Sequence, residues 1–170
     1  MTDHRPLILT ARMAPAAQLL FQRLRDRHFP PERNIVPAHL TLFHHLPGGE
    51  EAMIVERLKA VARGLEPVPV EVAGLRSLGQ GVAFDLRSED LADLRAELAE
   101  GWHGLLVPQD RQGWRAHVTV QNKVEAAVAK ATLAELSDGF RPWRFAVTGL
   151  QLWRYLGGPW EAVREVGFRG

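Results

Sequence analysis

The chain has 170 residues, of which 46% are hydrophobic and 24% charged, and its formal net charge is +1. This composition suits one domain over residues 1–170 with a buried core and excludes a disordered chain, while the near-neutral charge argues against a protein that wraps long nucleic acid. The chain contains no cysteine, which excludes disulfides, thiolate metal sites and cysteine nucleophiles.

The first apolar run is too short for a signal peptide, and no stretch reaches membrane-spanning length. We therefore expect a cytoplasmic monomer that does not contact a membrane.

Hydrophobic periodicity and chain breakers predict an alternating order of strands and helices. In chain order, they predict a strand at 7–10, a helix over 14–27, a strand at 39–46, a helix over 50–64, and strands at 68–75 and 81–86. A helix capped by Ser88 continues to Trp102, then a strand at 115–124, a helix over 125–136, and a hairpin with strands at 144–153 and 162–168.

One short pattern occurs twice, as His39-Leu40-Thr41-Leu42 and as His117-Val118-Thr119-Val120. The copies are 78 residues apart (117 minus 39), close to half the chain, and each lies in a predicted strand that a helix follows. This spacing indicates an internal duplication. It favours an α+β fold of two similar lobes that face each other and share one cooperative core.

Residues two apart in a strand point to the same face, so each copy presents a histidine and a threonine together and buries its two aliphatic residues. If the two strands approach each other, two imidazoles and two hydroxyls line one cleft. One imidazole can then act as a base and the other as an acid in a displacement at phosphorus, and the hydroxyls can donate to phosphate oxygens. A single His-x-Thr is common in strands for structural reasons alone, but two matched copies predict a phosphate site that needs no metal or other cofactor.

The chain resembles the two-histidine (2H) phosphoesterase superfamily, which contains bacterial RNA 2′,3′-cyclic phosphodiesterases, also called 2′-5′ RNA ligases. The resemblance rests on Pro37-Ala38-His39-Leu40-Thr41-Leu42-Phe43 and Arg115-Ala116-His117-Val118-Thr119-Val120, and the element order extends it over essentially the whole chain.

This resemblance implies a bilobal α+β fold whose two pseudo-two-fold-related lobes each carry a mainly antiparallel sheet flanked by helices. It also implies that the motif strands line a central cleft, with His39 and His117 as the acid–base pair and Thr41 and Thr119 as phosphate ligands. The implied substrate is an RNA 3′ end or a nucleotide with a cyclic or 2′-5′-linked phosphate. The superfamily also contains members with small or unknown substrates, so the substrate stays open here.

Other residues near the motifs are candidates for substrate binding. Phe43 and His45 are in phase with His39 along the strand, and Arg115 is in phase with His117. Phe43 could stack a base or pack in the core, Arg115 could bind phosphate or be a solvated cation, and His45 could reach the cleft mouth. His44 would face away from the cleft. A metal cluster of these histidines is the less favoured alternative, because no carboxylate stands at ligand spacing.

The C-terminal segment is rich in aromatic and basic side chains that could grip a nucleobase. Alternating aromatic residues in strands are more often core, so we predict that Trp143 and Trp153 are buried. Arg154 and Tyr155 are then candidates for the cleft rim. Two rival functions stay open, namely a nucleotide- or RNA-binding module without catalysis and a hydrolase for a small phosphodiester outside nucleic acids.

Overall fold

A computed structural model describes residues 2–170 of the protein. Its strands are β1 (Leu7–Met13), β2 (Leu40–Leu46), β3 (Val68–Ser77), β4 (Val82–Arg87), β5 (His117–Gln121), β6 (Trp143–Tyr155) and β7 (Trp160–Gly167). Its α-helices are α1 (Pro15–His28), α2 (Glu51–Arg63), α3 (Glu89–Gly101), α4 (Pro108–Arg111) and α5 (Ala126–Ser137). Short 3-10 helices cover Pro31–Arg33, Gly48–Glu50 and His103–Leu105.

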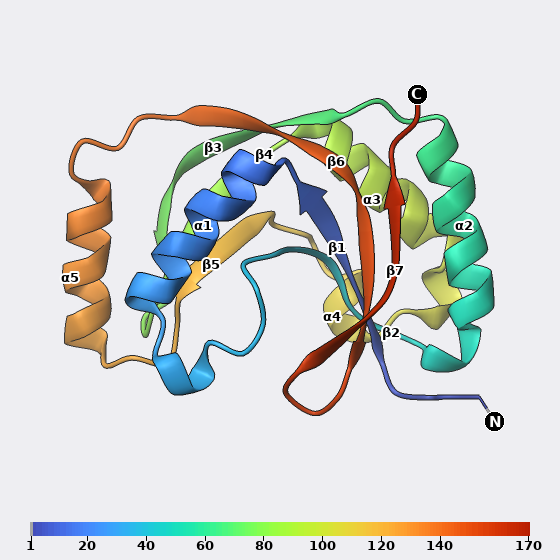
Figure 1. Ribbon diagram of the computed structural model, residues 1–170, viewed down its shortest axis with the longest axis horizontal. Coiled ribbons are helices and arrows are strands. Elements are labelled where there is room, and N and C mark those ends of the chain that lie inside the picture. The colour runs from blue at the N-terminus through green and yellow to red at the C-terminus, as the bar shows by residue number, and fades with distance from the viewer. Residues whose placement is uncertain (1) are drawn as a thin grey trace.

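The seven strands form one antiparallel sheet in the order β2-β1-β6-β3-β4-β5, and β7 pairs with β6. The long strand β6 is shared, because Trp143 to Val147 pair with β3 whereas the rest of the strand pairs with β1 and β7. Figure 1 shows the bend, where β6 leaves β3 and turns to run beside β1 and β7. The sheet therefore has two four-stranded halves, β2-β1-β6-β7 and β6-β3-β4-β5, and the two motif strands are its edges.

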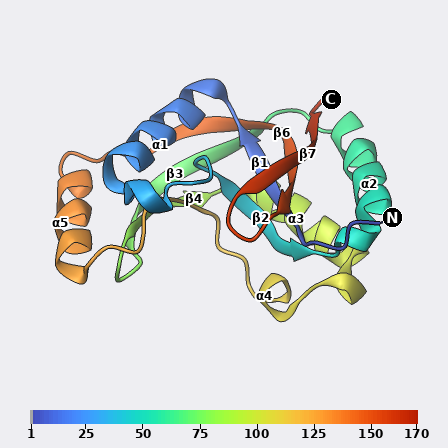
Figure 2. The same cartoon turned by 60° about the horizontal axis from the view of Figure 1, so that its bottom comes forward.

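Helices cover the sheet in two groups, as Figure 2 shows: α1 and α5 lie by the half that contains β3 and β4, and α2 lies by the other half. The fully buried ring of Phe21 on α1 packs against Phe84, Trp143 and Phe145, with ring centroids 5.5–5.9 Å apart. Ser88 caps α3 as predicted, because its hydroxyl accepts a hydrogen bond from the Leu91 backbone N–H.

The predicted α+β class is confirmed, and each predicted helix and strand is present with shifted ends. The sequence patterns missed α4 and the 3-10 helices, since one turn is too short to show periodicity. Trp143 packs against the core as predicted. Among residues 2–170, no helix is both long and apolar enough to cross a membrane.

Candidate active site

The two edge strands that carry the motifs come together although they lie at opposite ends of the strand order. The indole N–H of Trp114, in the segment that leads into β5, donates to the Thr41 backbone oxygen on β2 at 3.0 Å. The guanidinium of Arg25 on α1 donates to the Thr119 backbone oxygen at 3.5 Å. These bonds connect the two motif strands and α1, so both motifs contribute to one site.

The histidines of the two motifs are held in the same way. His39 lies one residue before β2, and its Nδ1 is 2.8 Å from the Pro37 backbone oxygen. His117 begins β5, and its Nδ1 is 2.9 Å from the Arg115 backbone oxygen. Because a carbonyl oxygen can only accept, each Nδ1 carries the hydrogen and each Nε2 keeps its lone pair. Both rings therefore present Nε2 for proton transfer.

Burial is the main cause that lowers the pKa of His39 to about 4, and nearby positive charges on Arg25, His117 and His44 act in the same direction. Burial also lowers the pKa of His117, and there the positive charges of Arg76 and His44 add to the effect. The charge of His44 thus acts on both motif histidines. At neutral pH both motif histidines are predominantly unprotonated.

The threonines lie where the strand alternation predicts. Thr41 and Thr119 are partly exposed, whereas their aliphatic neighbours are buried: Leu40, Leu42, Val118 and Val120. Thr41 pairs with Thr10 on β1, and Thr119 pairs with Ala83 on β4. We call the sheet face that carries Thr41, His117 and Thr119 the motif face.

An aromatic pair on the motif face lies beside His39. The rings of Trp160 and His39 have centroids 4.6 Å apart, and Trp153 lies 5.9 Å from Trp160. The indole N–H of Trp153 donates to the hydroxyl of Thr10, the partner of Thr41 across the β1–β2 pair. The prediction that Trp153 belongs to the core is therefore wrong, and sequence reasoning assigned no position to Trp160.

Of the two alternatives for Phe43, packing in the core is confirmed and stacking of a base is wrong. The β1–β2 pairing changes register between Leu9↔Phe43 and Thr10↔Thr41, so a β-bulge shifts Phe43 out of phase with Thr41. The Phe43 ring is fully buried, with the Trp102 ring centroid at 5.3 Å and the guanidinium carbon of Arg95 at 4.4 Å. Phe43 is a core residue.

A second register shift in the β1–β2 pair, between Leu7 and Leu9, changes the orientation of the next two histidines along β2. His44 and His45 are both exposed and both stand opposite Ile8 on β1, between the pairs Leu9↔Phe43 and Leu7↔Leu46, so the strict alternation that predicted His44 to face away does not hold. Asp110 on α4, only 1% exposed, accepts from both backbone N–H groups and lies 3.3 Å from Nδ1 of His44. A role for His45 in substrate binding stays a prediction.

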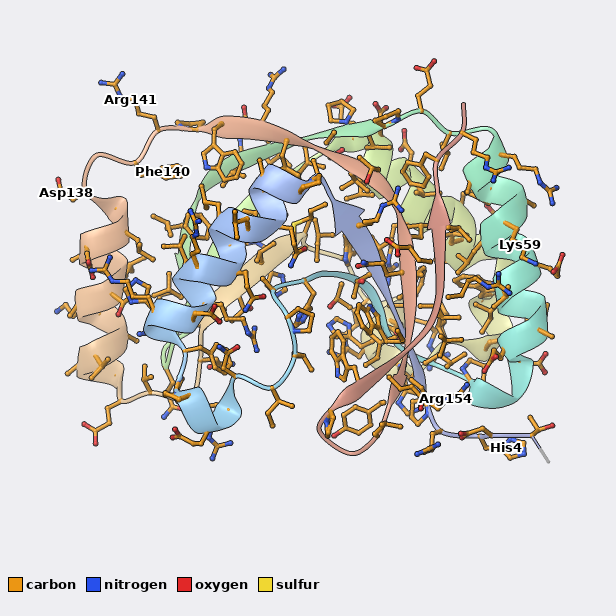
Figure 3. All side chains as sticks on the ribbon, viewed as in Figure 1. His4, Lys59, Asp138, Phe140, Arg141 and Arg154 are labelled. Carbon is orange, nitrogen blue, oxygen red and sulfur yellow. The ribbon has the colours of Figure 1, made fainter. Side chains whose placement is uncertain are left out.

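Arg154 does not reach the motif face. Its side chain is 10% exposed and forms ion pairs with Glu51, with Glu161 at 3.3 Å and with Asp3 at 3.5 Å. It alternates with Trp153 along β6 and therefore points to the opposite face, and Figure 3 shows it beside the N-terminal segment. The predicted rim position is wrong for Arg154, whereas Tyr155 is exposed and its role stays a prediction.

Two arginines lie beside His117. Arg115 is exposed and donates to Asp85 at 2.8 Å, so its role in substrate binding stays a prediction. Arg76, which the sequence patterns missed, lies 3.4 Å from the other oxygen of Asp85, with a side chain that is 22% exposed. It falls one residue beyond the predicted strand, so only a correct strand end could have placed it on this face.

Within residues 2–170 no three histidine, aspartate or glutamate side chains are arranged to hold a metal ion. The groups that the two motifs bring to this site are two imidazoles and two hydroxyls, with arginine side chains nearby.

A family model described as the 2′-5′ RNA ligase superfamily matches residues 13–159. The chain belongs to the 2′-5′ RNA ligase superfamily. This match confirms the resemblance inferred from the two motifs, and it covers both of them.

Solved structures with the same fold accompany this family match. TT0787 from Thermus thermophilus superposes with a TM-score of 0.68 at 16% identity, covering 97% of this chain and 98% of that chain. Escherichia coli LigT complexed with 3′-AMP gives 0.63 at 18% identity, covering 99% of this chain and 100% of that chain. A protein described as a phosphoesterase gives 0.62 at 18% identity with the same coverage. The curated proteins give no match in sequence.

Proposed function

We propose that this protein is a metal-independent phosphoesterase that opens the 2′,3′-cyclic phosphate of an RNA 3′ end or of a nucleotide. The observation that carries this proposal is the matched pair of histidines, each with Nδ1 bonded to the carbonyl oxygen two residues before it. Two edge strands bring this pair together, and each histidine is followed by a threonine on the motif face. Such a pair supplies a base and an acid to one phosphate.

The unequal environments of the two histidines assign their roles. Burial lowers the pKa of His39 to about 4, so its Nε2 is free to accept a proton over most of the pH range. His39 takes a proton from water as the water oxygen attacks phosphorus. His117, when protonated, donates its proton to the ribose oxygen that leaves, so the cyclic diester becomes a monoester. A proton then returns from His39 to His117 through solvent.

The threonine hydroxyls and the tryptophan pair complete this scheme. Thr41 and Thr119 donate hydrogen bonds to the two non-bridging oxygens, on which negative charge increases during attack. Trp160 and Trp153 lie beside His39 and offer apolar rings on which a base can stack.

If a 5′ hydroxyl of RNA takes the place of water, the same groups join it to phosphorus as the 3′ oxygen leaves, which is 2′-5′ ligation, and by microscopic reversibility they can return a 2′-5′ linkage to the cyclic phosphate. The superfamily match supports this chemistry, and the LigT crystal structures with 3′-AMP and ATP support a nucleotide as ligand.

The test is to incubate the protein with 2′,3′-cyclic nucleotides, cyclic-phosphate oligonucleotides and 2′-5′-linked oligonucleotides, and to identify products by mass. We expect ring opening by the parent. His39→Ala and His117→Ala should each lower kcat by about 10²–10⁴-fold, because each removes one acid or base. Their melting temperatures should stay close to that of the parent, because both rings are partly exposed.

Three outcomes would contradict the proposal. A substrate that is bound but unchanged after hours would favour the nucleotide-binding module, and activity only on a phosphodiester outside nucleic acids would favour the rival hydrolase. Loss of activity with a chelator would contradict the metal-independent mechanism. His103→Ala is a matched control, because this exposed histidine lies in the 3-10 helix His103–Leu105 and has no part in the proposed site.

A further inference from the structure

Three strands form a shallow floor next to the second motif. Across β3, β4 and β5, one row of paired residues is Gly74, Asp85 and His117, and the next row is Arg76, Ala83 and Thr119. Paired residues in antiparallel strands share a face, so both rows lie on the motif face. A Cβ added to Gly74 would have no neighbour within 4 Å. The side of the site beyond His117 is therefore open. Each row contains a small residue, with Gly74 at the end of the first row and Ala83 at the centre of the second.

The charges around this floor do not cancel. Arg76 and Arg115 both pair with Asp85, at 3.4 and 2.8 Å, so one carboxylate faces two guanidinium groups. Arg115 donates a hydrogen bond to Asp85, whereas Arg76 donates none within the described part of the chain. Its Nε and the nearer Asp85 oxygen are both buried without a hydrogen-bond partner. A mostly buried guanidinium thus keeps its hydrogen-bonding capacity and an unmatched positive charge beside His117.

Arg76 and Thr119 are two strands apart, about 10 Å between backbones, and only the small side chain of Ala83 stands between them. A phosphate held by Thr119 and a second anion held by Arg76 would therefore be neighbours. The reacting cyclic phosphate carries one negative charge, which the protonated imidazole of the acid balances. The positive charge left over on this side matches a second anionic group on the substrate.

We propose that Arg76, positioned by Asp85 over the open floor at Gly74, binds a second phosphate of the substrate, one carried on the 5′ oxygen of the nucleoside whose cyclic phosphate is opened. This inference rests on the proposed function and deepens it. The preferred substrate is then a cyclic phosphate with a second phosphate attached, and a nucleoside 2′,3′-cyclic monophosphate is a poor one. Such a phosphate can belong to an RNA chain or be a 5′-terminal monoester.

The experiment compares kcat/KM for adenosine 2′,3′-cyclic phosphate, its 5′-phosphorylated form, and the dinucleotide ApA with a terminal 2′,3′-cyclic phosphate. We expect the parent to favour both bis-phosphate substrates by about 10- to 100-fold, the effect of one charge-assisted contact. Arg76→Gln should abolish this preference, and Arg76→Lys should retain only part of it, because an ammonium keeps the charge without the planar fork. Gly74→Val, which a strand accommodates, should also abolish it by filling the open floor.

Arg57→Gln is the matched control, since Arg57 lies on α2 and pairs with Glu97, so this change removes the same charge away from the site. A binding measurement gives a second readout, in which adenosine 3′,5′-bisphosphate should bind the parent about 10- to 100-fold more tightly than adenosine 3′-phosphate and lose this advantage in Arg76→Gln. Thermal melts would show that the variant is folded.

The possible results separate the two proposals. If the parent opens all three substrates with equal kcat/KM, the subsite is wrong and the proposed function stands. If Arg76→Gln lowers all three equally, Arg76 binds the reacting phosphate and the subsite is again wrong. A preference for the dinucleotide alone that survives Arg76→Gln would assign the selectivity to the second base. If the parent opens none of them, the proposed function fails and the subsite fails with it.

Discussion

At the scale of single residues, the two histidines have the same bonded partner but different electrostatic surroundings. Each Nδ1 meets a backbone oxygen, which fixes the tautomer. Burial dominates both pKa values, but only His39 shifts as far as about 4. Because a base needs a low pKa to stay unprotonated and an acid needs a higher one to hold its proton, the difference separates the two roles.

This difference predicts an acidic optimum for kcat/KM. His39 as base must be unprotonated, so the rate should rise with pH through about 4. His117 as acid must be protonated, and burial holds its pKa below the ordinary 6.5, so the rate should fall about tenfold per pH unit above that value. A pH profile with a cyclic nucleotide checks this, and a rate that increases steadily from pH 6 to 8 would contradict the assignment.

Alternation along a strand correctly predicted that Thr41 and Thr119 are partly exposed and that their aliphatic neighbours are buried. It failed for side chains that depend on neighbours from elsewhere in the chain. Trp153 and Arg154 exchanged their predicted environments, because Arg154 finds carboxylates on α2 and β7 that keep it buried. No local pattern indicates such partners.

At the scale of elements, two β-bulges in the β1–β2 pair determine how the residues after the first motif are oriented. The shift between Leu9 and Thr10 buries Leu42 and Phe43 in succession, and the shift between Leu7 and Leu9 exposes His44 and His45 in succession. A bulge depends on the register of the partner strand, so the period-two pattern of β2 alone could not reveal it. The structure of the segment before β5 could not be predicted from sequence either, because α4 is only one turn long. This helix is held against β2 by hydrogen bonds to Asp110.

The position of Phe43 predicts a change in stability rather than in substrate binding. Phe43→Ala should lower the free energy of unfolding by about 3–5 kcal/mol, because it removes a buried ring and leaves a cavity. Phe43→Leu fills most of that space and should keep kcat/KM close to the parental value. Urea denaturation and steady-state kinetics on both variants check this. A Phe43→Leu variant with parental stability and a much higher KM would instead restore the stacking role.

At the scale of the whole molecule, the duplicated motif correctly predicted that distant parts of the chain converge, and the family match covers both copies. The repeat could not reveal how the convergence is secured. The two motif strands are opposite edges of one sheet, so the geometry of the site depends on the bend of β6 and on bonds across the gap between the edges. Trp114 supplies a bond across that gap, whereas Arg25 bonds α1 to β5 and Asp110 bonds α4 to β2, and the sequence around these three residues carries no signal of these bonds.

The bond from Trp114 to the Thr41 carbonyl predicts that activity is more sensitive than stability to a change at this position. Trp114→Phe removes one hydrogen bond worth about 0.5–1.5 kcal/mol, which should lower Tm by only a few degrees, about 2–4 °C per kcal/mol. Because catalytic groups misplaced by about 1 Å can cost 10²-fold in rate, kcat should fall about tenfold or more. Trp143→Phe is the matched control, since Trp143 packs against Phe21 and Phe145 beside the core, and it should lower Tm while kcat stays near the parental value. Parental kcat in Trp114→Phe would mean that the two edges hold their spacing without this bond.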